Sequence, residues 1–111
     1  MSECCANPPP DCCDMRGMLS FMMLWLLLKR EMYGQEIAEE IGSRRGTKPS
    51  PGTLYPALKD LESKGLISSR LEGRKRLYSL TEEGRRGATE ACEYFCRAYG
   101  DIFQQFSTKA A

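Results

Sequence analysis

Histidine does not occur in this sequence of 111 residues, and its absence limits the chemistry that the protein can perform. Histidine is the side chain used most often for proton transfer in catalysis, and no phosphate-binding loop or paired nucleophile and base stands in its place. The sequence therefore argues against an enzyme.

Long apolar runs are also scarce. The longest, residues 18–28, has eleven residues with Ser20 among them, whereas a membrane span needs roughly 20 apolar residues. This run is a poor secretory signal, because only Arg16 supplies positive charge before it and no small-residue cleavage site follows. We expect a one-domain cytoplasmic protein without a membrane partner, whose small core is enlarged by dimerisation.

Net charge is small, at +1, but it is unevenly distributed. Residues 43–76 carry nine cations and three anions, so this segment has a net charge of +6 and the rest of the chain −5. A basic centre is typical of a surface that binds a polyanion, although a solvated surface of mixed charge would have the same composition.

Apolar spacing and turn residues divide the chain into an arm, three helices, a hairpin and a last helix. Residues 1–14 contain four cysteines and three consecutive prolines without apolar periodicity, so we expect a flexible arm. Residues 15–31 are apolar on almost every side, which predicts a buried central helix. The other predicted elements are helices at 35–45 and 51–64, strands at 66–71 and 76–80, and a last helix capped by Thr81 that reaches about residue 106.

This order of elements predicts a mainly α fold with a two-stranded β wing, a winged helix-turn-helix. The DNA-binding domain takes residues 15–81, in which the second and third helices form the helix-turn-helix and the hairpin forms the wing. Residues 82–111 form a C-terminal dimerisation helix, and residues 1–14 remain a separate arm.

The third helix has clear start and stop signals. Ser50 can cap its N-terminus, Pro51 suits the first helical position, and Gly65 can adopt the left-handed conformation that ends a helix. Three leucines at helical spacing would face the core: Leu54, Leu58 and Leu61.

The opposite face of this helix is suited to a DNA groove, where hydroxyl groups and helical N–H groups can meet base edges or phosphates. Taken alone, Ser50 and Pro51 could be only a cap, and Tyr55 only a half-buried core residue. The cationic hairpin tip that follows favours DNA, because it could reach flanking phosphates. The candidate DNA contacts are Arg44, Arg45, Lys48, Ser50, Thr53, Tyr55, Lys59, Arg74, Lys75 and Arg76.

Three stretches together, GMLSFMMLWLLLKREMYGQEIAEEI, PSPGTLYPALKDLESKGLI and GRKRLYSLTEEGR, give the sequence a resemblance to the PadR family of transcriptional regulators. The resemblance covers about residues 17–87. It implies a winged helix, a homodimer built through the last helix, and usually repression by occupying an operator. By position, the resemblance places four residues on the recognition helix: Ser50, Thr53, Tyr55 and Lys59. It places Arg74, Lys75 and Arg76 on the wing. The cysteine-bearing arm and the short C-terminal segment depart from the family, so the resemblance does not identify an effector.

The last helix carries an apolar stripe with the spacing of a coiled-coil seam. Its members lie 4, 3, 4, 3 and 4 residues apart: Ala88, Cys92, Phe95, Tyr99, Ile102 and Phe106. Pairing with a second copy would bury this seam, whereas the alternative is that the stripe folds back on the first helix of its own chain. Twofold pairing would place two recognition helices about 34 Å apart on duplex DNA, which predicts a pseudo-palindromic operator.

The six cysteines form three pairs: Cys4 and Cys5, Cys12 and Cys13, and Cys92 and Cys96. Thiols stay reduced in the cytoplasm, and without histidine any metal site must use thiolate. The species that would fit are zinc, cadmium, copper(I), arsenite or an iron–sulfur cluster, although no spacing selects one of them. Cys92 could be only a seam residue, but packing does not explain four cysteines in a polar arm. Our hypothesis is a thiolate sensor that joins the arm to Cys92 and Cys96.

A second effector hypothesis is a flat aromatic ligand at the dimer centre, because some relatives accept such ligands. The candidate pocket residues are Met18, Met22, Trp25, Tyr94 and Tyr99, although ordinary core packing would also explain them. A different class of function also remains open, in which the winged helix binds a protein and the arm is a thiol tail for metal delivery or redox chemistry. Salt-dependent binding to duplex DNA would separate this alternative from a dimeric DNA-binding repressor.

Overall fold

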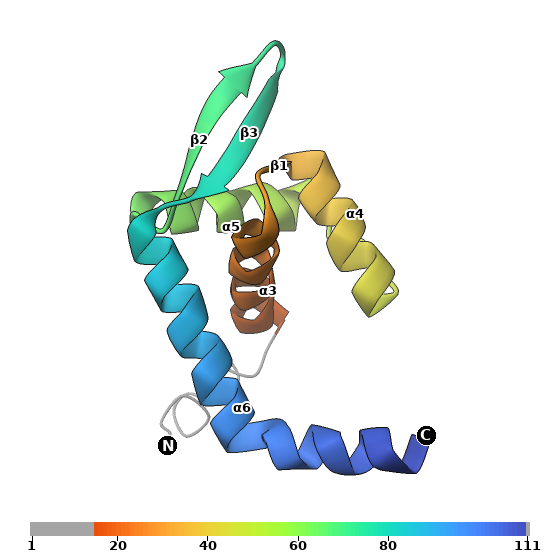
Figure 1. Ribbon diagram of the computed structural model, residues 1–111. Helices are drawn as coiled ribbons and strands as arrows, with labels where there is room; N and C mark the ends of the chain where they lie inside the picture. The colour runs from red at the N-terminus through yellow and green to blue at the C-terminus, as the bar shows by residue number, and fades with distance from the viewer. Residues whose placement is uncertain (1–14, 111) are drawn as a thin grey trace.

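The computed structural model describes residues 15–110, which form four helices and three strands (Figure 1). Helix α3 (Met15–Lys29) is followed by strand β1 (Met32–Tyr33), helix α4 (Gly34–Arg45) and helix α5 (Pro51–Ser63). Strands β2 (Ile67–Glu72) and β3 (Lys75–Leu80) form the wing, and the long helix α6 (Glu82–Ala110) follows. The winged helix-turn-helix fold with a long C-terminal helix is therefore confirmed.

Helix α3 lies at the centre of the domain, as its apolar sequence predicts. Leu19, Met23, Leu26 and Leu27 are almost completely buried. They pack with buried residues of α4 and α5, among them Ile37, Ile41, Leu54, Leu58 and Leu61. The same helix also packs against α6, so that one element supports both the helix-turn-helix and the C-terminal helix (Figure 1).

Helix α5 begins at Pro51 and ends before Gly65, as predicted. Gly65 has a φ of 78°, and the N–H of Leu66 donates to the carbonyl of Leu61 at 3.0 Å, which closes the helix. Ser50 takes the capping position, as predicted, although its hydroxyl makes no capping hydrogen bond. The N–H groups of the first turn already bond to the Ser50 carbonyl, at 3.0 Å from Thr53 and 2.8 Å from Leu54, and the Ser50 hydroxyl donates to Thr53 Oγ1 at 3.3 Å.

The sheet has one strand that the sequence analysis missed. Strand β1 pairs antiparallel with β3, with Met32 opposite Tyr78 and Tyr33 opposite Leu77. Two residues are too short to show the alternating pattern by which strands are recognised. This pairing fixes the base of the wing to the segment between α3 and α4.

The start of α6 is in close contact with two residues just after the C-terminus of α5, Gly65 and Leu66. The predicted cap is confirmed, because Thr81 Oγ1 accepts the N–H of Gly84 at 3.0 Å and also donates to the Gly65 carbonyl at 2.6 Å. A Cβ atom at Gly84 would overlap the carbonyl oxygen of Leu66, so only glycine fits there.

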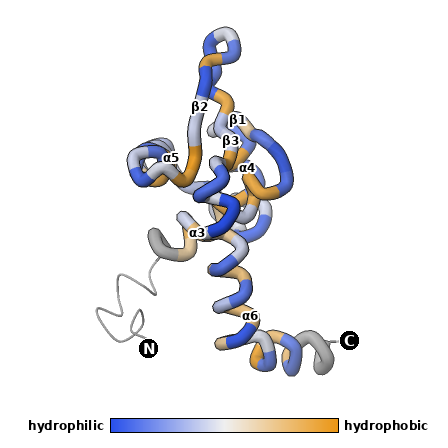
Figure 2. Tube along the Cα trace, turned by 60° about the vertical axis from the view of Figure 1, so that its left-hand side comes forward, coloured by the Kyte–Doolittle hydropathy of each residue, from blue (hydrophilic) through white to orange (hydrophobic). Residues whose placement is uncertain are grey.

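Beyond this joint, α6 runs away from the domain and changes direction in its second half (Figure 1). Hydrophobic residues recur along the coloured part of it, whereas the hairpin tip is mainly hydrophilic (Figure 2). Within residues 15–110, none of the helices combines the length and the hydropathy needed to cross a bilayer.

Candidate nucleic-acid interface

Helix α5 turns its leucines inward and a polar face outward. Leu54, Leu58 and Leu61 are buried, whereas Thr53, Tyr55 and Lys59 are exposed. The Tyr55 side chain keeps 45% of its surface accessible. The residues predicted for the recognition helix are therefore free to meet a partner.

Tyr55 also holds α5 close to the start of α4. A Cβ atom at Gly34 would lie 2.8 Å from the Tyr55 ring, so the ring needs glycine at this position. Gly34 is the first residue of α4, where backbone N–H groups have no partner within the helix. The Tyr55 hydroxyl and the N-terminus of α4 thus face the same space. The sequence analysis treated Tyr33 and Gly34 only as a break between helices.

Three wing cations remain without an acidic partner in the described part of the chain: Arg74, Lys75 and Arg76. Lys75 Nζ lies 5.3 Å from the centre of the Tyr33 ring, and Arg76 donates to Ser69 Oγ at 3.0 Å. Neither contact neutralises the charge. The positive potential of the wing tip is therefore available to an anion.

Arg70, lower on the wing, behaves differently. It bonds to Glu31 at 3.2 and 3.3 Å and to Glu72 at 2.9 Å, which together raise its pKa above the usual value. Glu31 precedes β1, so this ion pair ties the wing to the body of the domain.

A depression of about 330 Å³ lies where the wing, α4 and α5 meet. Its walls contain three tyrosines, the first residues of α4 and the wing cations, and none of them is acidic. They are Tyr33, Gly34, Gln35, Tyr55, Arg74, Lys75, Arg76 and Tyr78. We call this the wing cleft. Hydroxyl donors, the first N–H groups of a helix and three cations around one depression are the chemistry that binds a phosphate oxygen.

Tyr78 forms the floor of the wing cleft and is the least exposed of these tyrosines. Burial, followed by the influence of Tyr55, raises the pKa of Tyr78 above its ordinary value. Its hydroxyl therefore stays protonated at neutral pH and can donate a hydrogen bond.

Comparison with known proteins identifies the family. The sequence profile of the transcriptional regulator PadR-like family matches residues 23–90, which is more than half of the chain. The chain belongs to the PadR-like family of transcriptional regulators. The family is one of transcriptional regulators and not of enzymes.

Individual relatives agree with this assignment. Transcriptional regulator Rv3488 of Mycobacterium tuberculosis is 44% identical over 64 residues, which cover 54% of this chain and 59% of that protein. Transcriptional regulator YqjI of Escherichia coli is 34% identical over 77 residues, which cover 67% of this chain and 37% of that protein. The chain thus matches less than two thirds of the length of both relatives.

Solved structures show the same architecture. RosR of H. salinarum superposes with a TM-score of 0.69 at 29% identity, over 84% of this chain and 88% of that one. A PadR family regulator from Clostridium difficile has a TM-score of 0.67 at 31% identity, over 81% of this chain and 98% of that one.

Not every predicted DNA contact of this PadR-like chain lies near the wing cleft. Arg44 and Arg45 end α4, at the opposite end from Gly34. The Arg44 guanidinium lies 4.6 Å from the centre of the Trp25 ring, on the side of α3 and α6. Lys48 is exposed in the loop before α5.

The predicted effector residues are only partly brought together. Met22 and Trp25 line an apolar cavity that also contains Cys92 and Cys96, whereas Met18, Tyr94 and Tyr99 do not line it. The four arm cysteines, Cys4, Cys5, Cys12 and Cys13, lie outside the described residues. Within the described residues there is no cluster of three or more cysteine, aspartate or glutamate side chains that could hold a metal ion.

The predicted seam on α6 divides into two parts. Ala88 is completely buried and Phe95 contacts Phe21 of α3 edge to face, with ring centres 4.9 Å apart. Ile102 and Phe106 are exposed at 48% and 64%. The first half of the stripe thus packs on α3 of its own chain, which was the alternative to a dimer seam. The side chains of the second half are exposed to solvent.

Proposed function

We propose that this PadR-like protein is a cytoplasmic homodimer that binds a pseudo-palindromic DNA operator and represses transcription by occupying it. The proposal goes beyond family membership in three respects: the dimer, the twofold operator and repression. The dimer and the twofold operator are each open to a direct test, and repression is what occupying an operator usually causes in the family.

The observation that carries the proposal is the wing cleft. It combines three unpaired cations with the N-terminus of α4 and the Tyr55 hydroxyl, beside the exposed face of α5. We propose that the wing cleft holds a backbone phosphate and that Thr53, Tyr55 and Lys59 on α5 approach the major groove. Phosphate contacts would set the register, and the contacts of α5 would read the sequence.

The dimer is supported by the open half of the α6 stripe. Ile102, Phe103 and Phe106 expose large apolar surfaces on a segment that extends from the domain. Covering such surface contributes about 25 cal/mol per Å² of apolar area, and a second copy of the same helix offers a matching stripe. Pairing there leaves the two wings free to reach one duplex.

The test of phosphate binding is the salt dependence of DNA affinity, measured by fluorescence anisotropy on a duplex selected by the protein from a random pool. Each phosphate contact contributes about 0.9 to the slope of log affinity against log salt. Arg74→Ala should weaken binding and reduce this slope by about 1.8, because a dimer loses the contact twice. A protein-binding module, the alternative function, would show little salt-dependent DNA binding.

The matched control is Arg86→Gln on α6. Arg86 is an exposed cation that already pairs with Glu83 at 3.3 Å and lies outside the wing cleft. Its substitution should leave both affinity and slope unchanged. An equal loss from Arg74→Ala and Arg86→Gln would mean that only overall charge matters, and the wing cleft would lose its role.

The twofold operator has its own test. A duplex with one intact half-site and one scrambled half-site should bind far more weakly than the selected duplex, because only one recognition helix can engage it. Unchanged affinity for the half-site would contradict the twofold arrangement.

A response to thiol-binding effectors also remains a proposal, in which the arm cysteines act with Cys92 and Cys96. Affinity for the selected duplex would be measured with and without zinc, arsenite and an oxidant. The measurement is then repeated after all four arm cysteines are changed to serine. If no condition alters affinity in either protein, the arm has no part in regulation.

A further inference from the structure

An apolar cavity between α3 and α6 contains two thiols that the DNA-binding function does not use. Its volume is about 290 Å³, and its walls are Phe21, Met22, Trp25, Arg44, Cys92, Phe95 and Cys96. Phe21 contacts Phe95 edge to face on one side of it, and the Arg44 guanidinium lies over the Trp25 ring on another. We call it the dithiol cavity.

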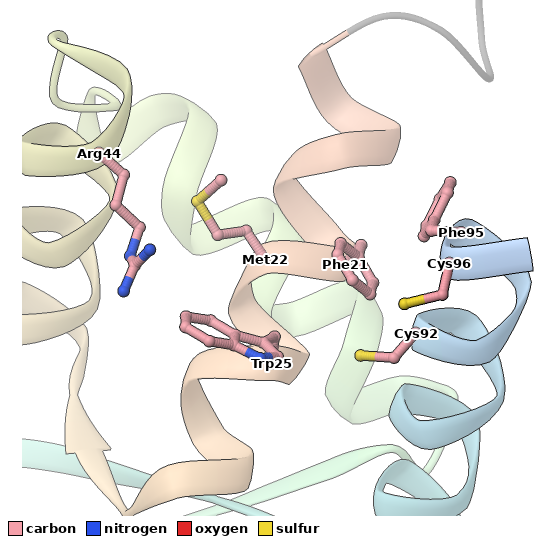
Figure 3. Close-up of a pocket in the computed structure, with 7 residues that line it drawn as sticks. All are labelled: Phe21, Met22, Trp25, Arg44, Cys92, Phe95 and Cys96. Carbon is pink, nitrogen blue, oxygen red and sulfur yellow. The ribbon is translucent and has the colours of Figure 1, made fainter. Parts of the chain in front are cut away.

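Both sulfur atoms point into the dithiol cavity. Cys92 and Cys96 are free thiols one helical turn apart, and Figure 3 shows their Sγ atoms side by side, directed toward Phe21 and Trp25. Cys96 is exposed and Cys92 is half-buried, so a reagent can reach the pair from solvent. Residues at this spacing lie close enough for both sulfurs to bind one atom.

The surroundings limit which atom that can be. Zinc in a structural site takes four ligands, and the arsenic of inorganic arsenite carries three oxygens, each of which a thiolate can replace. The dithiol cavity offers two, and the described part of the chain adds no third thiol or carboxylate to this lining. The rest of the wall is mainly hydrocarbon and aromatic. A species that fits needs two thiol bonds and carries an organic group in place of a third.

We propose that Cys92 and Cys96 form a binding site for monosubstituted trivalent arsenicals, with the organic group among Phe21, Met22 and Trp25. With phenylarsine oxide, each sulfur forms a bond to arsenic, and the two thiol protons leave with the arsenic-bound oxygen as one water molecule. Arsenic remains trivalent, so no oxidant or reductant is needed. This site uses two of the cysteines of the proposed thiol response but does not rest on it, because the arm cysteines take no part, and its test does not involve DNA.

The experiment uses the full chain with Cys4, Cys5, Cys12 and Cys13 changed to serine, which leaves only the two thiols of the dithiol cavity. Phenylarsine oxide is titrated while tryptophan fluorescence is recorded. Trp25 is the only tryptophan in the sequence and lines the dithiol cavity, so its emission reports on this site. The fluorescence change should end at one equivalent per protomer, and intact-mass measurement should show one phenylarsenic group.

Two thiols should act as a chelate. Cys96→Ser, at an exposed position, should raise the dissociation constant about 100-fold or more, because the second bond is intramolecular in the parent protein. Cys92→Ala gives the same test while keeping a small apolar group at the half-buried position. Melting curves of both variants check that the fold is retained.

The inorganic comparison tests the role of the apolar wall. Arsenite and zinc should each bind more weakly than phenylarsine oxide to the same four-serine protein. Equal or tighter binding of either would overturn the proposal in favour of an inorganic site completed by a partner copy. So would two phenylarsenic groups per protomer, unchanged Trp25 emission at saturation, or full affinity in either single-thiol variant.

Discussion

The wing and the second half of α6 lie at opposite ends of the molecule (Figure 1). Each packs against the rest of the domain at its base and exposes side chains to solvent at its other end. The wing ends in unpaired cations, whereas α6 ends in exposed apolar side chains. The exposed groups differ in kind, so the wing suits a polyanion in water and α6 suits another apolar surface.

The two bases are also built differently. The wing is fixed by the pairing of β1 with β3, by Tyr78 in the core and by the exposed ion pairs of Arg70. The base of α6 is fixed by close backbone contact at Gly84 and by the Thr81 hydroxyl. Close packing has little tolerance for change, whereas exposed ion pairs contribute little to stability. We therefore expect substitutions at the base of α6 to have the larger effects.

The largest effect is expected for Gly84→Ala. The added Cβ would overlap the backbone oxygen of Leu66, so the α6 joint must move, and the free energy of unfolding should fall by about 3 kcal/mol or more. Urea unfolding at fixed protein concentration measures it. Gly87→Ala is the control in the same turn, because nothing lies within 4 Å of its Cβ position. That variant should gain about 0.5–1 kcal/mol from helix propensity. Similar losses of unfolding free energy in both variants would show that the close contact between Gly84 and Leu66 does not determine stability.

A substitution at the exposed end of α6 should weaken dimerisation and should not affect the folding of each chain. Phe106→Lys places a charge on a side chain that is 64% exposed in one chain. In the proposed dimer both copies lose an apolar contact, so the dimer dissociation constant should rise about 100-fold or more. Analytical ultracentrifugation measures the change. Asp101→Lys, at an exposed position away from the stripe, is the control and should leave association intact.

These two predictions show what the sequence could and could not determine. The helix stop at Gly65 and the cap at Thr81 depend on neighbouring residues, so local signals predicted both. The packing of Tyr55 on Gly34 and the pairing of β1 join distant segments, and no local pattern indicated them.

The α6 stripe is a different case. Its spacing identified the apolar face correctly, but spacing is the same whether the face packs on its own chain or on another. Phe95 and Phe106 share the stripe, yet only the first meets α3. Charge patterns have the same limit, because Arg44 belongs to the basic segment and nevertheless stacks on Trp25.

The Arg70 ion pairs should orient the wing without stabilising the domain. Arg70→Ala should leave the urea midpoint nearly unchanged, because the side chains of the pair are about half exposed. Affinity for the selected duplex should fall several-fold, because the wing tip would lose its fixed direction. Glu31→Ala breaks the same contact from the other side. The double variant should lose no more affinity than Arg70→Ala alone, and additive losses would place Arg70 on the DNA itself.

The smallest effect is expected at the base of the wing, at high pH. Tyr78 is buried and its pKa is raised above the ordinary value of 10.0, so the folded protein holds the Tyr78 proton more tightly than the unfolded chain does. Stability is unaffected below the unfolded-state pKa and is lost as pH rises from there through the folded-state pKa. Tyr78→Phe removes this loss of stability. The variant and the parent should therefore have the same urea midpoint at neutral pH and different midpoints above about pH 10. Urea midpoints across this range measure the difference, with Tyr94→Phe on exposed α6 surface as the control. If Tyr94→Phe differs from the parent above this pH and Tyr78→Phe does not, the tyrosine that destabilises the protein at high pH lies on α6 and not beneath the wing.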